Sequence, residues 1–174
     1  IWPRGFPLDE IKVKNNFKGK IEKIYSPIQQ HLSDKDPDVD AIYRLTHKET
    51  NIKFLKKRAL GIYHNTYSTF NSQNTRWFKC VFPLLYLPTC CTFRACDIWR
   101  GLIALRVLHA NNMPLTYSSA TNLQQRNYHN IFNDFKDEIP FYLKNKKIIN
   151  AIYSIKLLKG EKNIIPSMKL IYTK

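Results

Sequence analysis

Four aspartates stand at every second position in the stretch SDKDPDVDAIYRLT, just ahead of an arginine, Arg44. They are Asp34, Asp36, Asp38 and Asp40. Carboxylates this close repel one another by roughly 0.2–1 kcal/mol for each exposed pair. A divalent ion that bridges a diphosphate, a set of backbone N–H donors, or water would offset that repulsion. The plainest interpretation is a solvated turn in which Asp40 caps the element that follows.

Two well-known sites are excluded by spacing. A calcium loop of the EF-hand type that started at Asp34 would need glycine and glutamate where the chain has Val39 and Leu45. The register that starts at Asp36 fails in the same way. The chain has only five glycines and none of them cluster, which excludes a P-loop or a G-x-G-x-x-G phosphate loop.

The composition indicates one folded domain with a strongly positive charge. The chain has 174 residues, 44% hydrophobic and 24% charged, and a net charge of +15. Such a charge raises nucleic acid or an anionic ligand as a partner. Residues 141–174 alone hold eight lysines against one glutamate, without a recognisable nucleic-acid module. We therefore favour a solvated lysine-rich face, and nucleic acid is the least favoured partner.

The four cysteines lie within 17 residues of an apolar segment, at Cys80, Cys90, Cys91 and Cys96. No C-x-x-C pair occurs, so the spacing is not that of a zinc site. Buried free thiols are favoured over disulfides for such a cluster.

The elements that position these residues are predicted from hydrophobic periodicity. Strands are expected at 40–47, 80–88 and 113–121, and a short strand and a helical turn across 19–32. One helix is expected at 96–112, and one or two helices at 130–155. Asp97 is expected as N-cap or first-turn acid of the first helix. Pro140 is expected to break the second. Strands that alternate with helices indicate an α/β fold.

Several segments, in order, resemble a known family. They are WPRGFPL, SPIQQHLSDKDPDVDAIYRLT, FNSQNT, CDIWRGLIALRVL and LQQRNYHNIFNDFKDE. Together they resemble the STELLO glycosyltransferase-like proteins. A more distant likeness reaches the reversibly glycosylated polypeptides, the UDP-arabinopyranose mutases.

The resemblance implies a GT-A-like fold, in which a nucleotide-binding half precedes an acceptor-binding half. This chain would be the acceptor-side portion of a longer protein. It would form a single domain over 1–174, with a lysine-rich helical extension over 140–174. A Mn or Mg ion would then be held mainly by ligands upstream of Ile1. The aspartate run would lie at the edge of the sugar cleft, held by Arg44, backbone donors and water.

The resemblance also implies roles for single residues. Asp97 would be the general base toward an acceptor hydroxyl, with helix capping as the alternative. Substrate contacts would come from Asp38, Asp40, Arg44, Asn71, Gln73, Asn74, Trp99 and Arg100. Each of these residues also has a purely structural alternative. The segment 71–74 could form an Asx turn, Arg100 a surface salt bridge, and Trp99 part of the core. We interpret His129 as a structural histidine and not as a metal ligand.

These interpretations predict a glycosyltransferase-like domain that acts on a nucleotide sugar, with a UDP-sugar favoured, and on a glycan or protein acceptor. The alternative is a catalytically inactive GT-A-derived module that assists other glycan-synthesising enzymes. The resemblance implies a location at the membrane of the Golgi or another secretory compartment.

Overall fold

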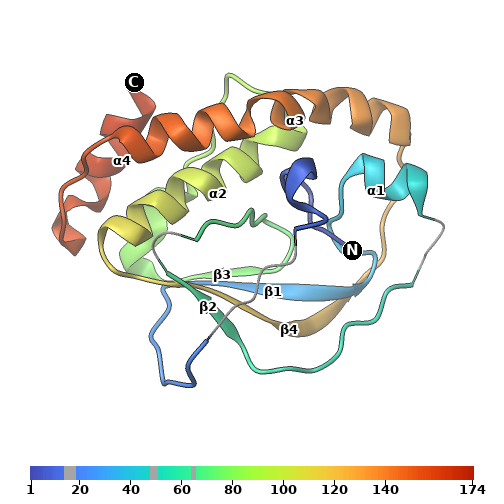
Figure 1. The fold of residues 1–174 in the computed structure, drawn as a ribbon, viewed down its shortest axis with the longest axis horizontal. Coiled ribbons are helices and arrows are strands. Elements are labelled where there is room, and N and C mark those ends of the chain that lie inside the picture. The colour runs from blue at the N-terminus through green and yellow to red at the C-terminus, as the bar shows by residue number, and fades with distance from the viewer. Residues whose placement is uncertain (14–18, 48–50, 64–65) are drawn as a thin grey trace.

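The computed structural model describes residues 1–13, 19–47, 51–63 and 66–174. A twisted four-stranded sheet lies beneath a layer of helices, and the other face of the sheet is crossed by extended segments (Figure 1). The predicted α/β class is confirmed. The assignment to a GT-A-like half remains a prediction.

The sheet has the strand order β2-β4-β1-β3. Its strands are β1 (Ile28–Lys35), β2 (Leu60–Ile62), β3 (Thr75–Trp77) and β4 (Leu115–Gln124). The central pair, β1 and β4, is parallel, and both edge strands are antiparallel to their neighbours. The strand predicted near 113–121 is therefore confirmed, whereas the helical turn expected within 19–32 is wrong. Hydrogen bonds along both edges of β1 hold that segment extended.

Two predicted strands are helices instead. Residues Ala41–Thr46 form α1, because Asp40 accepts a hydrogen bond from the backbone N–H of Tyr43 at 2.7 Å and so starts a helix. Residues Lys79–Leu85 form a 3-10 helix, η2, that contains Pro83. Proline cannot donate to a strand ladder, and a three-residue spacing places Val81 and Leu84 on one buried side.

The long helix α2 spans Phe93–Ala110 and ends at Asn111, the predicted stop. It starts three residues earlier than predicted, with Thr92 as its N-cap residue. Most of its circumference is buried, because it lies between the sheet and the helices α3 and α4. Gly101 of α2 lies close to Phe70, and a Cβ at this position would lie 2.7 Å from the carbonyl oxygen of Phe70.

The helix α3 spans Ile131–Ser154, and the short helix α4 spans Ile164–Tyr172. Two further 3-10 turns are η1 (Leu8–Glu10) and η3 (Glu161–Asn163). Pro140 does not break α3, contrary to the prediction. The helix packs on α1 as well as on α2, and these contacts hold its course. None of the helices in the described part of the chain could span a membrane.

All four cysteines are free thiols, as predicted. They are not buried, however. Cys90 is exposed, and the other three are partly exposed beside η2 and the start of α2.

Candidate functional site

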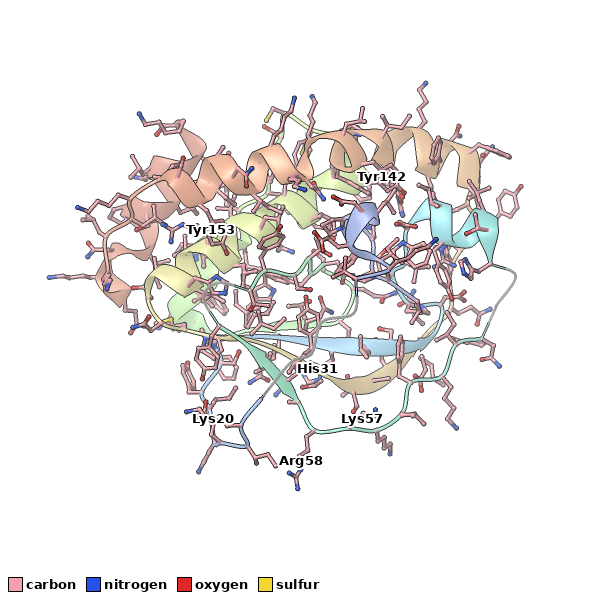
Figure 2. All side chains as sticks on the ribbon, viewed as in Figure 1. Lys20, His31, Lys57, Arg58, Tyr142 and Tyr153 are labelled. Carbon is pink, nitrogen blue, oxygen red and sulfur yellow. The ribbon has the colours of Figure 1, made fainter. Side chains whose placement is uncertain are left out.

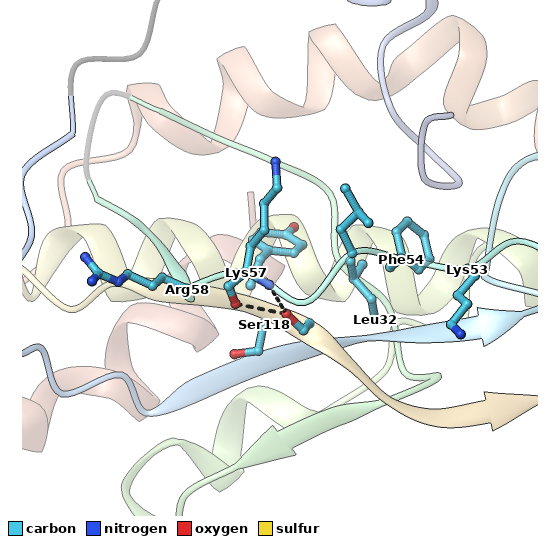
Figure 3. A pocket seen from close by; sticks show the side chains of 9 residues that line it. Leu32, Lys53, Phe54, Lys57, Arg58 and Ser118 are labelled. Atoms are coloured by element: carbon cyan, nitrogen blue, oxygen red, sulfur yellow. Dashed lines mark hydrogen bonds between the residues drawn. The ribbon is translucent and has the colours of Figure 1, made fainter.

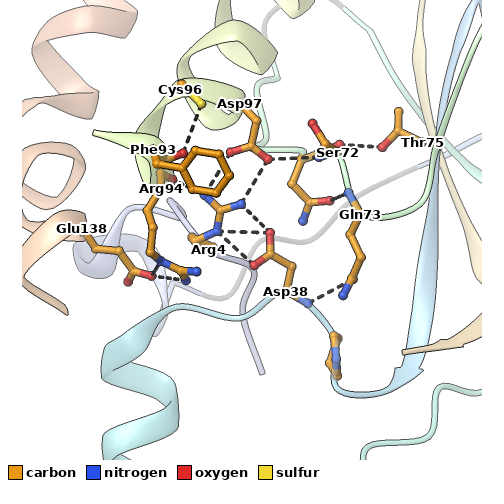
Figure 4. Close-up of polar contacts among 12 residues, drawn as sticks. Arg4, Asp38, Ser72, Gln73, Thr75, Phe93, Arg94, Cys96, Asp97 and Glu138 are labelled. Atoms are coloured by element: carbon orange, nitrogen blue, oxygen red, sulfur yellow. Dashed lines mark hydrogen bonds and ion pairs between the residues drawn. The ribbon is translucent and has the colours of Figure 1, made fainter. Parts of the chain in front are cut away.

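A cluster of charged side chains lies where three segments meet (Figure 4). These segments are the turn that follows β1, the first half of α2 and the N-terminal residues around Arg4. The side chains at its centre are Arg4, Asp38 and Asp97, and we call them the Arg4 cluster. The cluster is close to the carboxyl end of the parallel strand β1, the edge at which open α/β sheets usually bind ligands.

Arg4 binds both carboxylates of the cluster. Its Nε lies 2.9 and 3.1 Å from the two oxygens of Asp38, and its Nη2 lies 2.7 Å from Oδ2. Its Nη1 and Nη2 lie 3.0 and 3.1 Å from Oδ1 and Oδ2 of Asp97. Nη1 also donates to the backbone oxygen of Arg94. The three side chains are 8%, 15% and 13% exposed, in the order Arg4, Asp38 and Asp97. All three nitrogens of the Arg4 guanidinium thus donate to groups within the protein.

The pairing fixes the charges of Arg4 and Asp38. Burial on its own would raise the pKa of Asp38, but the charge and hydrogen bonds of Arg4 hold that pKa below its ordinary value. Burial likewise opposes the charge of Arg4, yet Asp38 and Asp97 raise the pKa of its guanidinium above the ordinary value. Both groups are therefore ionised at neutral pH.

The turn at Asn71–Gln73 positions the carboxylates of the cluster. Asn71 Oδ1 accepts from the backbone N–H of Gln73 at 3.0 Å. This is the Asx turn predicted as the structural alternative for this segment. Gln73 Oε1 accepts from the backbone N–H of Asp38 at 3.2 Å. The backbone N–H of Ser72 donates to Asp97 Oδ2 at 3.1 Å. A sugar-binding role for Asn71 and Gln73 stays a prediction, since their amides already serve this turn.

Asp97 is not a cap of α2. It is the fifth residue of the helix, and the prediction that it stands at the N-terminus is wrong. Its oxygens contact Arg4 and Ser72 instead. Thr92 makes no side-chain cap hydrogen bond and Phe93 is 89% exposed, so neither a capping bond nor a buried apolar residue marks the start of α2.

The remaining aspartates of the run each have a different partner. Asp40 is fully buried, and it accepts from the Tyr43 N–H and from Trp2 Nε1, both at 2.7 Å. Burial raises its pKa to about 6. Asp40 is thus the helix cap of the plain interpretation, and its complete burial closes its carboxylate to a substrate in this structure.

Asp34 and Asp36 are held by backbone donors. Asp34 Oδ1 accepts from the N–H of Phe54 at 2.9 Å, and Asp36 Oδ2 accepts from the N–H of Arg126 at 3.2 Å. Arg44 lies 3.8 Å from Asp36 and donates at 2.8 Å to the carbonyl of Pro37. In the part of the chain that the structure describes, no three histidine, cysteine or acidic side chains gather into a metal-binding group.

The predicted substrate residues of α2 point in two directions. Arg100 faces the turn and donates to Ser72 Oγ at 3.0 Å, with its guanidinium 4.7 Å from the ring centre of Trp77. It is 3% exposed, and its Nε is buried without a hydrogen bond to any described residue. Trp99 faces α3, where its Nε1 donates to Asn145 Oδ1 at 2.8 Å. The Arg4 cluster therefore lies near Arg100 but not near Trp99.

Two other predicted residues lie outside the cluster. Asn74 Nδ2 donates to the carbonyl of Leu32 and to Thr121, both at 3.0 Å, so it ties the turn to the sheet. His129 Nδ1 is 3.6 Å from Asp134, and its side chain is 43% exposed. The interpretation of His129 as a structural histidine stays a prediction.

Sequence reasoning missed three charged residues of this region. Arg4 lies in the segment WPRGFPL, but the sequence does not indicate a role for it. Arg94 and Glu138 form a second ion pair, with Arg94 Nε 2.7 Å from Glu138 Oε1. Glu138 is fully buried, and its Oε2 accepts from the N–H of Ala41 at 2.8 Å and from Tyr142 at 2.6 Å. No local pattern marks these residues, since the ion pairs of Arg4 and Arg94 join distant parts of the chain.

The second half of the chain is similar to a known protein family. The family model of STELLO glycosyltransferases matches residues 94–171. Two Arabidopsis thaliana proteins, "Probable glycosyltransferase STELLO2" and "Probable glycosyltransferase STELLO1", are 31% and 30% identical over 115 residues. Residues 94–171 are thus similar to the STELLO glycosyltransferases. The stretch of 115 residues is 62% of the chain, and the chain spans about 15% of the length of these two curated relatives.

The STELLO match includes part of the cluster. Asp97, Arg94 and Arg100 lie within residues 94–171, and Arg4 and Asp38 lie outside that range. The more distant likeness to the UDP-arabinopyranose mutases stays a prediction.

Proposed function

We propose that this STELLO-like chain is the acceptor-side part of a GT-A-like glycosyltransferase, that it acts on a nucleotide sugar, and that Asp97 is its catalytic carboxylate. The observation that supports this most is the place of Asp97. It belongs to the region that matches the STELLO family, and it lies near the carboxyl end of the parallel strand β1.

The geometry of Asp97 suits a general base. Oδ1 accepts one hydrogen bond, from Arg4, whereas Oδ2 accepts two, from Arg4 and from the Ser72 N–H. A carboxylate oxygen has two lone pairs, so Oδ1 keeps one for the hydroxyl of an acceptor. Arg4 and Ser72 hold the carboxylate in place, and the side chain keeps 13% of its surface exposed.

The donor is proposed to be a UDP-sugar, and the acceptor a glycan or a protein. The ligands of a Mn or Mg ion would come mainly from outside this chain. Asp38 is committed to Arg4, and Asp40 to Tyr43 and Trp2. The setting would be the membrane of the Golgi or another secretory compartment.

A second function is favoured by another observation. The carboxylates of Asp38 and Asp40, together with the amides of Gln73 and Asn74, are bonded within the protein. Such internal pairing is what a catalytically inactive module would keep for its structure. The alternative is therefore a GT-A-derived module that assists other glycan-synthesising enzymes.

One experiment separates the two functions. The full-length protein is incubated with a panel of UDP- and GDP-sugars and Mn²⁺, and release of the nucleoside diphosphate is followed over time. An enzyme releases nucleotide from one or a few donors, more strongly from UDP-sugars. An absence of turnover across the panel, with co-purification of glycan-synthesising enzymes, would support the assisting module instead.

A further inference from the structure

The long helix α3 carries an apolar stripe on its outer side. The helix runs along the edge of the molecule and is farther from the sheet than α2 (Figure 1). Its side chains Phe132, Ile139 and Leu143 are 71%, 38% and 70% exposed. Because a helix turns 100° for each residue, these three side chains fall within an arc of about 40°, over roughly 16 Å of the helix. We call them the α3 stripe.

The α3 stripe is not the side by which α3 joins the core. That contact is made by Phe141, Ile149 and Ile152, which are at most 6% exposed. Phe141 follows Phe132 by nine residues and therefore lies on the opposite side of the helix. Figure 2 shows how the helix side of the molecule, with Tyr142 and Tyr153 of α3, is separated by the sheet from Lys57 and Arg58. The helix thus has one apolar side in the core and a second apolar line in solvent.

Lysines flank the α3 stripe. Four of them are exposed on the outer half of the helix, Lys136, Lys144, Lys146 and Lys147. Lys146 pairs with the exposed Asp9 at 3.3 Å, and the other three form no ion pair within the described part of the chain. Two acids of the helix, Asp134 and Glu138, are buried and pair with Arg94. The outer side of α3 is therefore both apolar and positively charged.

This combination of apolar and basic side chains distinguishes between kinds of partner. A second copy of the chain would bring lysines against lysines, which repel each other. A specific protein partner needs about 800 Å² on each side, from roughly 20–30 residues, whereas the α3 stripe is three side chains on one helix. A membrane surface needs no matching shape, since apolar side chains enter the boundary of the acyl chains while lysines reach anionic headgroups.

We infer that α3 docks on a membrane surface that contains anionic phospholipids. The α3 stripe enters the boundary between headgroups and acyl chains, and Lys136, Lys144 and Lys147 contact the anionic headgroups. The helix lies along the surface and does not cross it. This contact uses no residue of the Arg4 cluster, so it does not depend on the proposed transferase activity.

The test is co-sedimentation of the 174-residue chain with vesicles of phosphatidylcholine alone or with 30% phosphatidylserine. The chain should bind the anionic vesicles about tenfold or more tightly than the neutral ones, and salt should weaken this binding. The variant Phe132→Ser/Leu143→Ser should weaken binding to the anionic vesicles about tenfold or more. Lys136→Ala/Lys144→Ala/Lys147→Ala should also weaken it about tenfold or more.

Matched controls come from the segment 53–60, on the far side of the sheet. Lys53 and Lys57 lie beside a pocket there (Figure 3), and Leu55 and Leu60 are 78% and 57% exposed. The variants Leu55→Ser/Leu60→Ser and Lys53→Ala/Lys56→Ala/Lys57→Ala make the same chemical changes away from α3, and both should bind as wild type does. All of these side chains lie outside the core, so each melting temperature should stay within about 2 °C of wild type.

Three results would overturn the inference. The first is equal binding to both kinds of vesicle, or binding to neither. The second is an equal loss in the α3 variants and their controls. The third is self-association in analytical ultracentrifugation that Phe132→Ser/Leu143→Ser abolishes, without vesicle binding, which would assign the α3 stripe to a second copy of the chain.

Discussion

Arg4 contacts both oxygens of Asp97, at 3.0 and 3.1 Å, although the two residues are 93 positions apart in the sequence. The same guanidinium binds Asp38, so one arginine forms ion pairs with two nearly buried carboxylates. This contact joins the N-terminal segment to α2 and sets the orientation of the proposed catalytic group.

Removal of Arg4 should cost much of the stability of the protein. Arg4→Ala leaves the carboxylates of Asp38 and Asp97 without their cation, and we expect a loss of about 3–5 kcal/mol in the free energy of unfolding. Arg4→Lys should lose less, because an ammonium group keeps the charge but does not reproduce the planar contacts to both carboxylates. Urea unfolding of the three proteins measures these differences.

The control for this experiment is Lys146→Ala. Lys146 pairs with Asp9 at 3.3 Å, but the two side chains are 70% and 63% exposed. Loss of such a pair should change stability by less than about 1 kcal/mol. Equal losses from Arg4→Ala and Lys146→Ala would contradict the view that the Arg4 cluster is a buried ion network.

The buried cap Asp40 should make stability depend on pH. Its folded pKa is about 6, above the ordinary 3.8, because burial disfavours the charged form. The folded state therefore holds the proton more tightly than the unfolded state. The contribution of Asp40 to stability is largest below about pH 4 and falls as pH rises through 6.

The variant Asp40→Asn isolates this effect, since asparagine is also a good helix cap but does not ionise. Between pH 4 and pH 7, the difference in unfolding free energy should move in favour of the variant by up to about 3 kcal/mol. Asp38, whose pKa is shifted the other way, is present in both proteins and cancels. A difference that stays constant over this pH range would show that Asp40 has an ordinary pKa.

Gly101 should resist even a methyl group. A Cβ at this position lies 2.7 Å from the backbone oxygen of Phe70, which cannot move without the turn that follows it. We expect Gly101→Ala to lower stability by about 1–3 kcal/mol. Gly19, which has nothing within 4 Å of its would-be Cβ, is the control, and Gly19→Ala should be neutral. Thermal melts of the two variants compare them, and a stabilised Gly101→Ala would contradict the close packing of α2 here.

The sequence predicted those elements whose hydrophobic spacing and end residues lie within the element itself. The body of α2 carries apolar residues at helical spacing, and Asn111 marks its end, so the helix was found. The β4 strand was also found. By contrast, α1 and η2 are short apolar runs that fit a strand equally well by periodicity. Asp40, which caps α1, and Pro83, which cannot donate to a strand ladder, are the residues that distinguish a helix from a strand in these two segments.

The Arg4 cluster was only half visible in the sequence. Asp38 and Asp97 were singled out, but nothing near Arg4 indicates that it binds residues 34 and 93 positions away. The predicted place of Asp97 on α2 was also wrong, because the helix begins three residues before the predicted start. Such long-range partners follow from how the elements pack, and periodicity does not encode that packing.

The most direct test of the central claim is sugar transfer by Asp97→Asn in the full-length protein. The rate of nucleotide release is measured with the best donor of the UDP-sugar panel, with the exposed Asp9→Asn as control. The account predicts a fall of roughly 10²–10⁴-fold for Asp97→Asn and none for Asp9→Asn, while circular dichroism shows that both variants are folded. Wild-type turnover in Asp97→Asn would contradict it.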